Sequence, residues 1–460
     1  MPGMSAGMSE QVLSPQGSQR ELMEAQAGLE ASRGFSVLAS WRAAVSQRDS
    51  WRYLLGLGIL WMLLGMVIMP AGASFNPGKI YQGSLILLMY LPALWLACTQ
   101  RGRLWRELWP LPLFRLFLIM LAWATVSLAW AHLRHPGDEF GRLLSVMTFV
   151  LAWQLWDSDS EDYVSMLLFV GGIGVALCAG FYCVVFLLHP DSSDRIAGEG
   201  TIAATNYAAA LMGAVSIWMT QLRLRTRHLS ILRWVAIVLL LAFVGLTHTR
   251  GVWLALGTCI VLAPLWQSMR LRHWLMIMAG LLVVLAIAAP MHLLTERGMS
   301  LRPQLLEASL HQIAQRPLLG LGQGTPITLW VDGLAYTHSH NLLTQVTLEL
   351  GLPGLLLTVA MWLMVGWQGW RFRHTMRGRI LLGLWIYASV VLQFDMPQLL
   401  DSPRPGWILV WLPFSLAIAL GLRKRAQDKI GESRLDESRF DESRFDKSGR
   451  AEGRADIIHR

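Results

Sequence analysis

The sequence predicts an all-α polytopic membrane protein with about twelve transmembrane helices. Hydrophobic residues make up 54% of its 460 residues and charged residues only 15%, whereas an ordinary soluble domain carries about 25% charged residues. Long apolar runs recur from Trp51 to Leu422, and each spanning helix needs roughly 20 apolar residues. Basic residues in the short loops between these runs account for the net charge of +9. A soluble fold is therefore excluded, and no nucleic-acid partner is needed to explain the charge.

The apolar runs define the predicted helices and divide the chain into five regions. We expect transmembrane helices over residues 52–69, 80–98, 111–130, 140–156, 164–188, 203–222, 231–247, 251–267, 273–291, 342–367, 379–394 and 406–421. The regions are an N-terminal tail (1–50), helices one to nine (51–291), an external segment with its own helix between helices nine and ten (292–341), helices ten to twelve (342–421) and a C-terminal tail (422–460).

The arginines and lysines of alternate loops indicate the orientation of the chain. Five segments carry most of them, at residues 101–106, 223–227, 270–272, 371–379 and 423–425. Short loops rich in Arg and Lys stay in the cytoplasm. Both termini are therefore predicted to be cytoplasmic, and the intervening loops are predicted to lie on the other side of the membrane.

The two tails are polar. Residues 1–50 lack the basic start and apolar core of a signal peptide, so we interpret this stretch as a weakly ordered cytoplasmic tail. Residues 432–446 repeat Glu-Ser-Arg followed by an apolar residue and Asp. This composition favours a solvated, disordered tail, although its charges could also pair on a helix.

The external segment 292–341 interrupts the alternation of spans and short loops, and long loops often carry functional sites. Apolar residues at helical spacing between Leu301 and Ile313 predict a helix that lies along the membrane surface and caps the transmembrane core. Pro317, Gly320, Gly322 and Gly324 then predict a turn-rich run.

Three arginines lie on the predicted external side, although most basic loop residues lie on the predicted cytoplasmic side. They are Arg195, Arg250 and Arg302. An arginine at a membrane boundary is costly unless it is paired or used, and its planar fork suits a phosphate group. These residues predict a binding site for a lipid-linked diphosphate, and the alternative is that each contacts a lipid headgroup.

Two histidines stand immediately before the tenth predicted span. His338 and His340 lie in Thr-His-Ser-His-Asn, and a histidine can act as a general base near neutral pH. Either ring could be the base, and Asn341 could orient a sugar or the imidazole. The alternative is again contact with headgroups. Gly351 and Gly354 have the spacing that lets another helix approach closely.

A later external loop carries two carboxylates. Asp395 and Asp401 flank a Pro-containing turn with Gln398 and Arg404. These groups could position an acceptor, or the carboxylates could simply pair with loop arginines, and the sequence leaves both interpretations open.

The histidine motif carries a family resemblance. A His and an Asn, followed by nine residues, a Gly, two residues and another Gly, resemble the signature of bacterial O-antigen ligases, whose superfamily includes O-antigen polymerases and protein O-oligosaccharyltransferases. The matching positions are His340, Asn341, Gly351 and Gly354. Weaker similarities are Arg250 with Leu254, the segment 316–324, and Arg195 with Gly198 and the Asn-Tyr-Ala-Ala block at 206–209.

The resemblance implies a GT-C-like transferase in the bacterial inner membrane, with its active site facing the periplasm. The donor would be O-antigen linked to undecaprenyl diphosphate, the acceptor would be lipid A–core oligosaccharide, and the transfer would invert the anomeric carbon. Membrane lipids would surround the protein, and no cofactor or metal is expected. The Asp-x-Asp string of the sequence, residues 157–159, falls in a predicted cytoplasmic loop.

The same resemblance implies roles for the arginines and the histidines. Arg195, Arg250 and Arg302 would stabilise the leaving diphosphate in place of a metal ion, while His340 or His338 would deprotonate the acceptor. The alternatives are an O-antigen polymerase, a protein O-oligosaccharyltransferase and, more distantly, a polysaccharide or lipid transporter. A cytoplasmic nucleotide-sugar transferase built on residues 157–159 is the weakest of them.

Overall fold

The computed structural model describes residues 50–68, 77–156, 161–189, 195–224, 226–267, 301–395, 398–430 and 432. The predicted ninth span (273–291), nearly all of the two tails and the start of the external segment lie outside these residues. The elements described below belong to one compact unit that begins at Leu54, apart from the first residues of α3.

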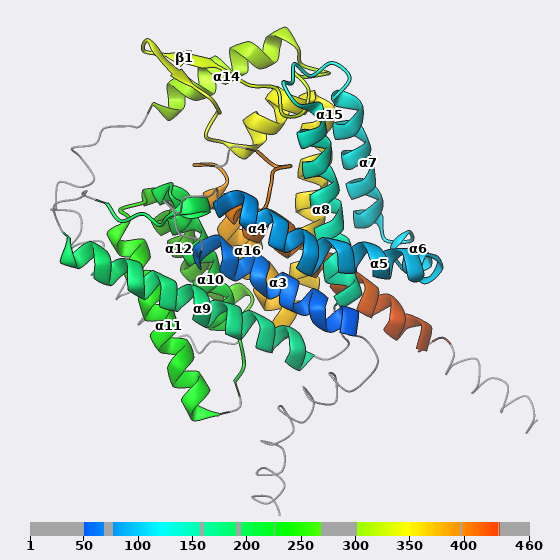
Figure 1. Cartoon of the computed structure of the whole chain (residues 1–460), viewed down its shortest axis with the longest axis vertical. Coiled ribbons are helices and arrows are strands. Elements are labelled where there is room, and N and C mark those ends of the chain that lie inside the picture. Colours follow the sequence, from blue (N-terminus) through cyan, green and yellow to red (C-terminus); the bar gives the residue numbers. More distant parts are fainter. Residues whose placement is uncertain are drawn as a thin grey trace, which may run out of the picture. The chain divides into compact units, whose positions relative to one another are not determined.

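The described elements are almost all helical (Figure 1). The first group comprises α3 (Ser50–Ile68), α4 (Pro77–Leu85), a π-helical turn (Ile86–Tyr90), α5 (Leu91–Thr99), α6 (Arg101–Leu108), α7 (Pro112–Ser127), α8 (Pro136–Trp156) and α9 (Glu161–Leu188). The second comprises α10 (Thr205–Gln221), α11 (Arg227–Leu246), α12 (Arg250–Leu262), α14 (Arg302–Gln315), β1 (Leu329–Val331), β2 (Leu334–Tyr336), α15 (Leu342–Arg371) and α16 (Met376–Val391). Short 3-10 turns lie at Gly200–Ile202 and Ala263–Leu265, and the last long helix runs over Trp407–Ile430.

Six helices among the described residues are long and apolar enough to cross a membrane. They are Trp51–Ile68, Ile80–Thr99, Tyr163–Leu188, Arg227–Leu246, Leu342–Arg371 and Trp407–Ile430. The pair α6 and α7, bent by 106°, would make a seventh if it forms one span. An all-α membrane protein is consistent with these helices, but the predicted count of twelve is not confirmed. Helices α10 and α16 do coincide with predicted spans, yet they contain only 17 and 16 residues.

Helix α10 lies at the centre of the packing. It contacts α9, α11, α12 and α16 (Figure 1), and most of its side chains are buried. The hydroxyl of Tyr387 on α16 donates to the carbonyl of Ala210 at 3.0 Å, and Gly213 leaves the space that this phenol occupies. The start of α10 is thereby held against the ends of α12 and α16, where the functional side chains gather.

Helix α15 is broken at Gly351. This residue has φ 66° and ψ −170°, a backbone conformation that side chains disfavour. The break exposes carbonyl groups of the preceding turn, and three donors satisfy them. The amides of Leu321 and Gly322 donate to Leu348 and Glu349 at 2.8 Å, and the indole of Trp123 donates to Leu350 at 2.9 Å.

The close neighbour of Gly351 is a loop, which corrects the predicted helix–helix contact. A Cβ at Gly351 would overlap the carbonyl of Leu318, and the amide of Leu352 donates to Pro317 at 2.8 Å. Gly354 faces the Leu350 side chain of its own helix. Gly351 therefore admits the turn-rich run after α14, because the kinked backbone pairs with it.

The structure confirms the helix that was predicted after Leu301, and this helix is α14. It packs with a two-stranded hairpin over a small apolar core made by Leu305, Ile327, Leu329, Val331 and Leu348. The hairpin was not predicted from the sequence. Its turn residues Asp332 and Gly333 have φ 50° and 78°, as a tight two-residue hairpin requires. The placement of α14 along a membrane surface stays a prediction.

Candidate functional site

The two histidines face one carboxylate. The Nδ1 atom of His340 lies 3.1 Å from Oδ1 of Asp395, and the Nε2 atom of His338 lies 3.6 Å from the same oxygen. The two rings lie against each other with centroids 3.9 Å apart. Since 3.6 Å exceeds a good hydrogen bond, Asp395 orients His340 more firmly than His338.

Side chains of α15 hold the backbone turn of the histidine motif. His340 has φ 55°, which is uncommon outside glycine and marks local strain. The amide of Ser339 donates to Oε1 of Gln345 at 3.1 Å, and Nε2 of Gln345 donates to the buried Glu349 at 2.7 Å. These contacts hold the residue between the two histidines in place.

Asn341 caps the first turn of α15. Its side-chain oxygen accepts from the amides of Leu343 and Thr344 at 2.9 and 3.2 Å, and its amide donates to Oε1 of Gln393 at 2.9 Å. An asparagine at this position satisfies amides that have no partner within the helix. The imidazole is therefore oriented by Asp395 and not by Asn341, which corrects one of the two roles predicted for Asn341.

Asn206 connects the histidines to Arg195. Its amide donates to Oδ2 of Asp395 at 2.6 Å, while its oxygen accepts from Arg195 at 3.2 Å. Arg195 also donates to the Thr247 carbonyl at 2.7 Å and to the Thr249 hydroxyl at 3.2 Å. These three contacts fix the guanidinium in one orientation.

Asp395 is held in its charged form. Burial by itself raises the pKa of this carboxyl, but its polar contacts with His338, His340 and Asn206 outweigh burial and lower the pKa well below its usual range. An ionised carboxylate next to the rings can stabilise an imidazolium that forms during a reaction.

Arg302 and Arg250 lie near the same group. The guanidinium of Arg302, at the start of α14, lies 5.2 Å from the ring centre of Phe394. Burial lowers the pKa of Arg302, Asp395 raises it and Arg250 lowers it, so the charges are close enough to interact. Arg250 begins α12 and is exposed. Leu254 is 54% exposed, one turn further along this helix, and no contact ties it to the site.

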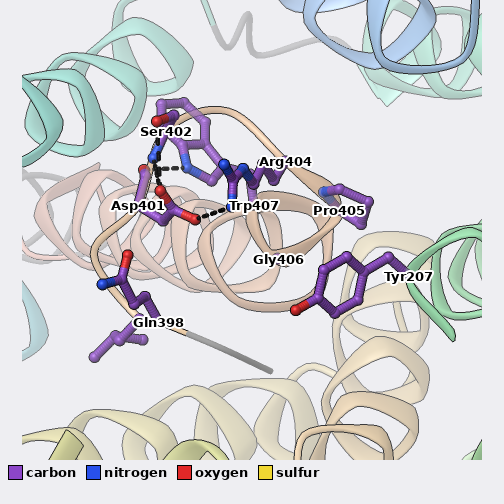
Figure 2. A pocket seen from close by; sticks show the side chains of 9 residues that line it. Tyr207, Gln398, Asp401, Ser402, Arg404, Pro405, Gly406 and Trp407 are labelled. Atoms are coloured by element: carbon purple, nitrogen blue, oxygen red, sulfur yellow. Dashed lines mark hydrogen bonds and ion pairs between the residues drawn. The ribbon is translucent and has the colours of Figure 1, made fainter. Parts of the chain in front are cut away.

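Asp401 pairs with arginines. Its Oδ2 lies 3.1 Å from Arg404 and its Oδ1 lies 3.7 Å from Arg142, which supports pairing among the two roles left open for this carboxylate. Gln398 accepts a long hydrogen bond of 3.4 Å from Arg142. Gln398, Asp401 and Arg404 border a pocket with Tyr207 and Trp407 (Figure 2).

Comparison with known proteins shows which proteins the chain is similar to. Residues 235–359 match the family model described as O-antigen ligase. A protein of Pseudomonas aeruginosa named O-antigen ligase is 25% identical to the chain over 398 residues, which cover 83% of this chain and 94% of the relative. The chain is therefore similar to O-antigen ligases, in this segment and over most of its length. The matched segment contains Arg250, Arg302 and both histidines, whereas Arg195 and Asp395 lie outside it.

The segment that matches the O-antigen ligase model contacts the rest of the chain at Asp395, through His340, and at Asn206, through Thr249. Sequence reasoning missed Asn206, Thr249 and Gln345 as site residues. Asn206 stands in a block that resembles the family, which was the only signal for it. The other two are ordinary polar residues near motif positions, and only the folded chain shows their contacts.

The same triad could hold a metal ion. One ligand atom each from His338, His340 and Asp395 lies within 4.8 Å of the others, and two histidines with one carboxylate form a known metal-binding set. The prediction of a metal-independent member of the O-antigen ligase family is not tested by this geometry. A chelator experiment distinguishes the two interpretations.

Proposed function

We propose that this protein is a member of the O-antigen ligase family and acts as a glycosyltransferase. It transfers O-antigen polysaccharide from undecaprenyl diphosphate to a sugar hydroxyl of lipid A–core, at the periplasmic face of the inner membrane. The observation that carries the proposal is the connected group His340, Asp395, Asn206 and Arg195, which links a candidate base to a candidate diphosphate-binding arginine. The helices would hold two lipid-anchored substrates at one surface.

His340 is the base in this proposal. When its Nδ1–H donates to Asp395, Nε2 is left with a free lone pair. Nε2 takes the proton of the acceptor hydroxyl as that oxygen attacks the anomeric carbon. The bond from this carbon to the diphosphate oxygen breaks with inversion, and the proton on His340 passes to solvent. His338, in contrast, packs on the His340 ring and points its own Nε2 at Asp395.

The arginines act on the leaving group. Arg195 is already oriented by three hydrogen-bond acceptors, so little reorganisation is needed when charge develops on the diphosphate. Arg302 is partly desolvated, which strengthens its attraction for an anion. Arg250 adds a third charge at the start of α12. In this scheme Asp395 orients the base, Gln398 remains the residue proposed to serve the acceptor, and Asp401 pairs with Arg404 and Arg142.

The alternatives differ mainly in the acceptor. A polymerase or a protein O-oligosaccharyltransferase would use the same base and the same donor chemistry, and the name of the Pseudomonas aeruginosa relative favours a ligase. A transporter would be expected to carry ionisable residues along a path through the membrane. The gathering of His340, Asp395 and Arg195 at helix ends favours chemistry instead.

Lipopolysaccharide gels of a deletion strain test this function. Wild type should restore the polysaccharide ladder, whereas His340→Ala should leave bare lipid A–core, because loss of a general base costs roughly two to four orders of magnitude in rate. His338→Ala should retain much more transfer. With purified protein, wild-type transfer should continue in the presence of a chelator.

Gln315→Ala, an exposed change on α14, is the matched control and should behave as wild type. Full ladders from His340→Ala would rule out the base. Loss of wild-type activity with chelator would favour the metal interpretation of the triad. Core capped with a single repeat in the deletion strain would indicate a polymerase.

A further inference from the structure

Phe394 stands just after α16, between two residues of the candidate site. Its backbone amide donates to the carbonyl of Val391 at 2.9 Å, so the chain turns directly at the end of the helix. Gln393, before it, binds the helix cap Asn341, and Asp395, after it, faces the two histidines. The contacts that build the site therefore also fix the backbone of Phe394.

The ring of Phe394 contacts Arg302. The guanidinium carbon lies 5.2 Å from the ring centre, within the range of attraction between a cation and an aromatic face. Arg195 is held by three hydrogen-bond acceptors, whereas no hydrogen bond or ion pair within the part of the chain that the structure describes holds the Arg302 side chain. The ring is thus the contact that orients Arg302, and it leaves the five N–H donors of this guanidinium for phosphate oxygens.

The same ring also packs against the first turn of α12. A Cβ at Gly251 would lie 2.9 Å from Cδ2 of Phe394 and 3.0 Å from its Cβ and Cγ, so only a glycine leaves room for this ring. Gly251 is buried and directly follows Arg250. One ring therefore contacts the first turns of both α12 and α14, the two helices that begin with Arg250 and Arg302.

Arg250 and Arg302 carry like charges in one region. They are near enough that Arg250 lowers the pKa of Arg302, and like charges repel each other unless an anion joins them. A carboxylate could hold Arg302 in place, but it would neutralise the charge that a diphosphate needs. An uncharged ring can hold the guanidinium without neutralising it.

We infer that Phe394 is a positioning residue whose ring orients Arg302 toward the donor diphosphate and sets its spacing from Arg250. The inference rests on the proposed transferase function. The alternative is that Phe394 only fills space beside Gly251, in which case any apolar side chain of similar size would serve equally well.

Binding of undecaprenyl diphosphate to the purified full-length protein tests the inference. Phe394→Leu keeps an apolar side chain but removes the aromatic face. We expect the Kd to rise about 3- to 10-fold, the loss expected from one cation–π contact. Phe394→Tyr keeps the face and should bind as wild type does. Phe181→Leu, the same change at an exposed position of α9, should leave the Kd unchanged.

A double-mutant cycle shows whether the ring acts through Arg302. In an Arg302→Gln background, Phe394→Leu should weaken binding no further, because the contact is already lost. In an Arg195→Gln background, Phe394→Leu should add its full loss. Gly251→Ala, which displaces the ring from its other side, should also weaken binding, although alanine favours a helix more than glycine does.

Three results would overturn the inference: no binding of the diphosphate by wild type, wild-type binding by Phe394→Leu, or an equal loss with and without the Arg302 side chain. A loss in Phe394→Tyr as large as in Phe394→Leu would show that the fit of the side chain matters and its aromatic face does not. Wild type that binds the diphosphate but transfers no glycan would refute the proposed function alone, because the binding measurements still decide the role of Phe394. Thermal unfolding of each variant near the wild-type temperature shows that folding is intact.

Discussion

At the residue scale, Asp395 is the junction of the candidate site. One oxygen faces both histidines and the other accepts from Asn206, so a single carboxylate links the base to the residue that orients Arg195. Because three donors converge on it, the charged form is favoured despite burial. An ionised partner also fixes which nitrogen of His340 carries the proton.

Asp395→Asn should therefore reduce transfer strongly while the protein still inserts. The neutral amide no longer stabilises an imidazolium, and we expect a loss of roughly 10²- to 10⁴-fold in rate.

The contribution of Asp395 to the stability of the protein depends on pH with a defined sign. Because folding lowers the pKa of Asp395, its contribution is present above the unfolded value of about 4. This contribution is lost as pH falls through the folded value.

Thermal unfolding of the detergent-solubilised protein checks this sign. The variant should unfold at a lower temperature than wild type near neutral pH, and the gap should narrow below about pH 4. A gap that widens in acid, or an Asp395→Asn variant with full activity, would contradict the proposed role.

At the element scale, the first turns of α15 support the histidine motif. Gln345 donates a hydrogen bond to Glu349, one helical turn further along α15, and accepts one from the amide of Ser339. Glu349 is only 3% exposed, and a buried polar group is costly unless it is hydrogen-bonded. The carboxylate is thus placed to position the turn without touching a substrate.

A double-mutant cycle tests this relay. Gln345→Ala and Glu349→Ala should each lower the transfer rate about tenfold, because each loosens the Ser339 amide. The double variant should be no worse than either single variant, since both remove the same chain of contacts. Additive losses would show that Glu349 acts independently of Gln345. Because the turn orients the base, the KM for the donor should stay near the wild-type value.

The sequence predicted much of this region, for identifiable reasons. Apolar spacing predicted α14, and the motif spacing singled out His340 and Gly351. The pairing of His340 with Asp395 could not be read from the sequence, because the two residues are 55 positions apart and meet only when α15 packs on α16. The break at Gly351 was missed because helical apolar residues continue on both sides of it.

At the scale of the whole molecule, hydropathy predicted the positions of the helices well. It predicted less well which of these helices are long and apolar enough to span a membrane. Each predicted span within the described residues coincides with a helix, yet only six or seven meet the length and hydropathy of a crossing. Helix α8 shows one cause. Its first turn contains Asp138 and Glu139 and its second turn contains Arg142, so charged residues reduce its apolar length. The sidedness of the chain stays a prediction from loop charge.

Cysteine accessibility decides the sidedness. Gly102→Cys lies in the basic segment predicted to be cytoplasmic, where an added side chain meets nothing within 4 Å, and Gln315→Cys lies at the end of α14. Both are made in a background where the four native cysteines are replaced by alanine or serine, because Cys98 is exposed. A membrane-impermeant maleimide should label residue 315 in intact spheroplasts and residue 102 only after permeabilisation, as loops rich in arginine stay inside. The reverse pattern would place His340 and its arginines at the cytoplasmic face, where a glycan already moved to the periplasm could not reach them, and the proposed transfer would fail.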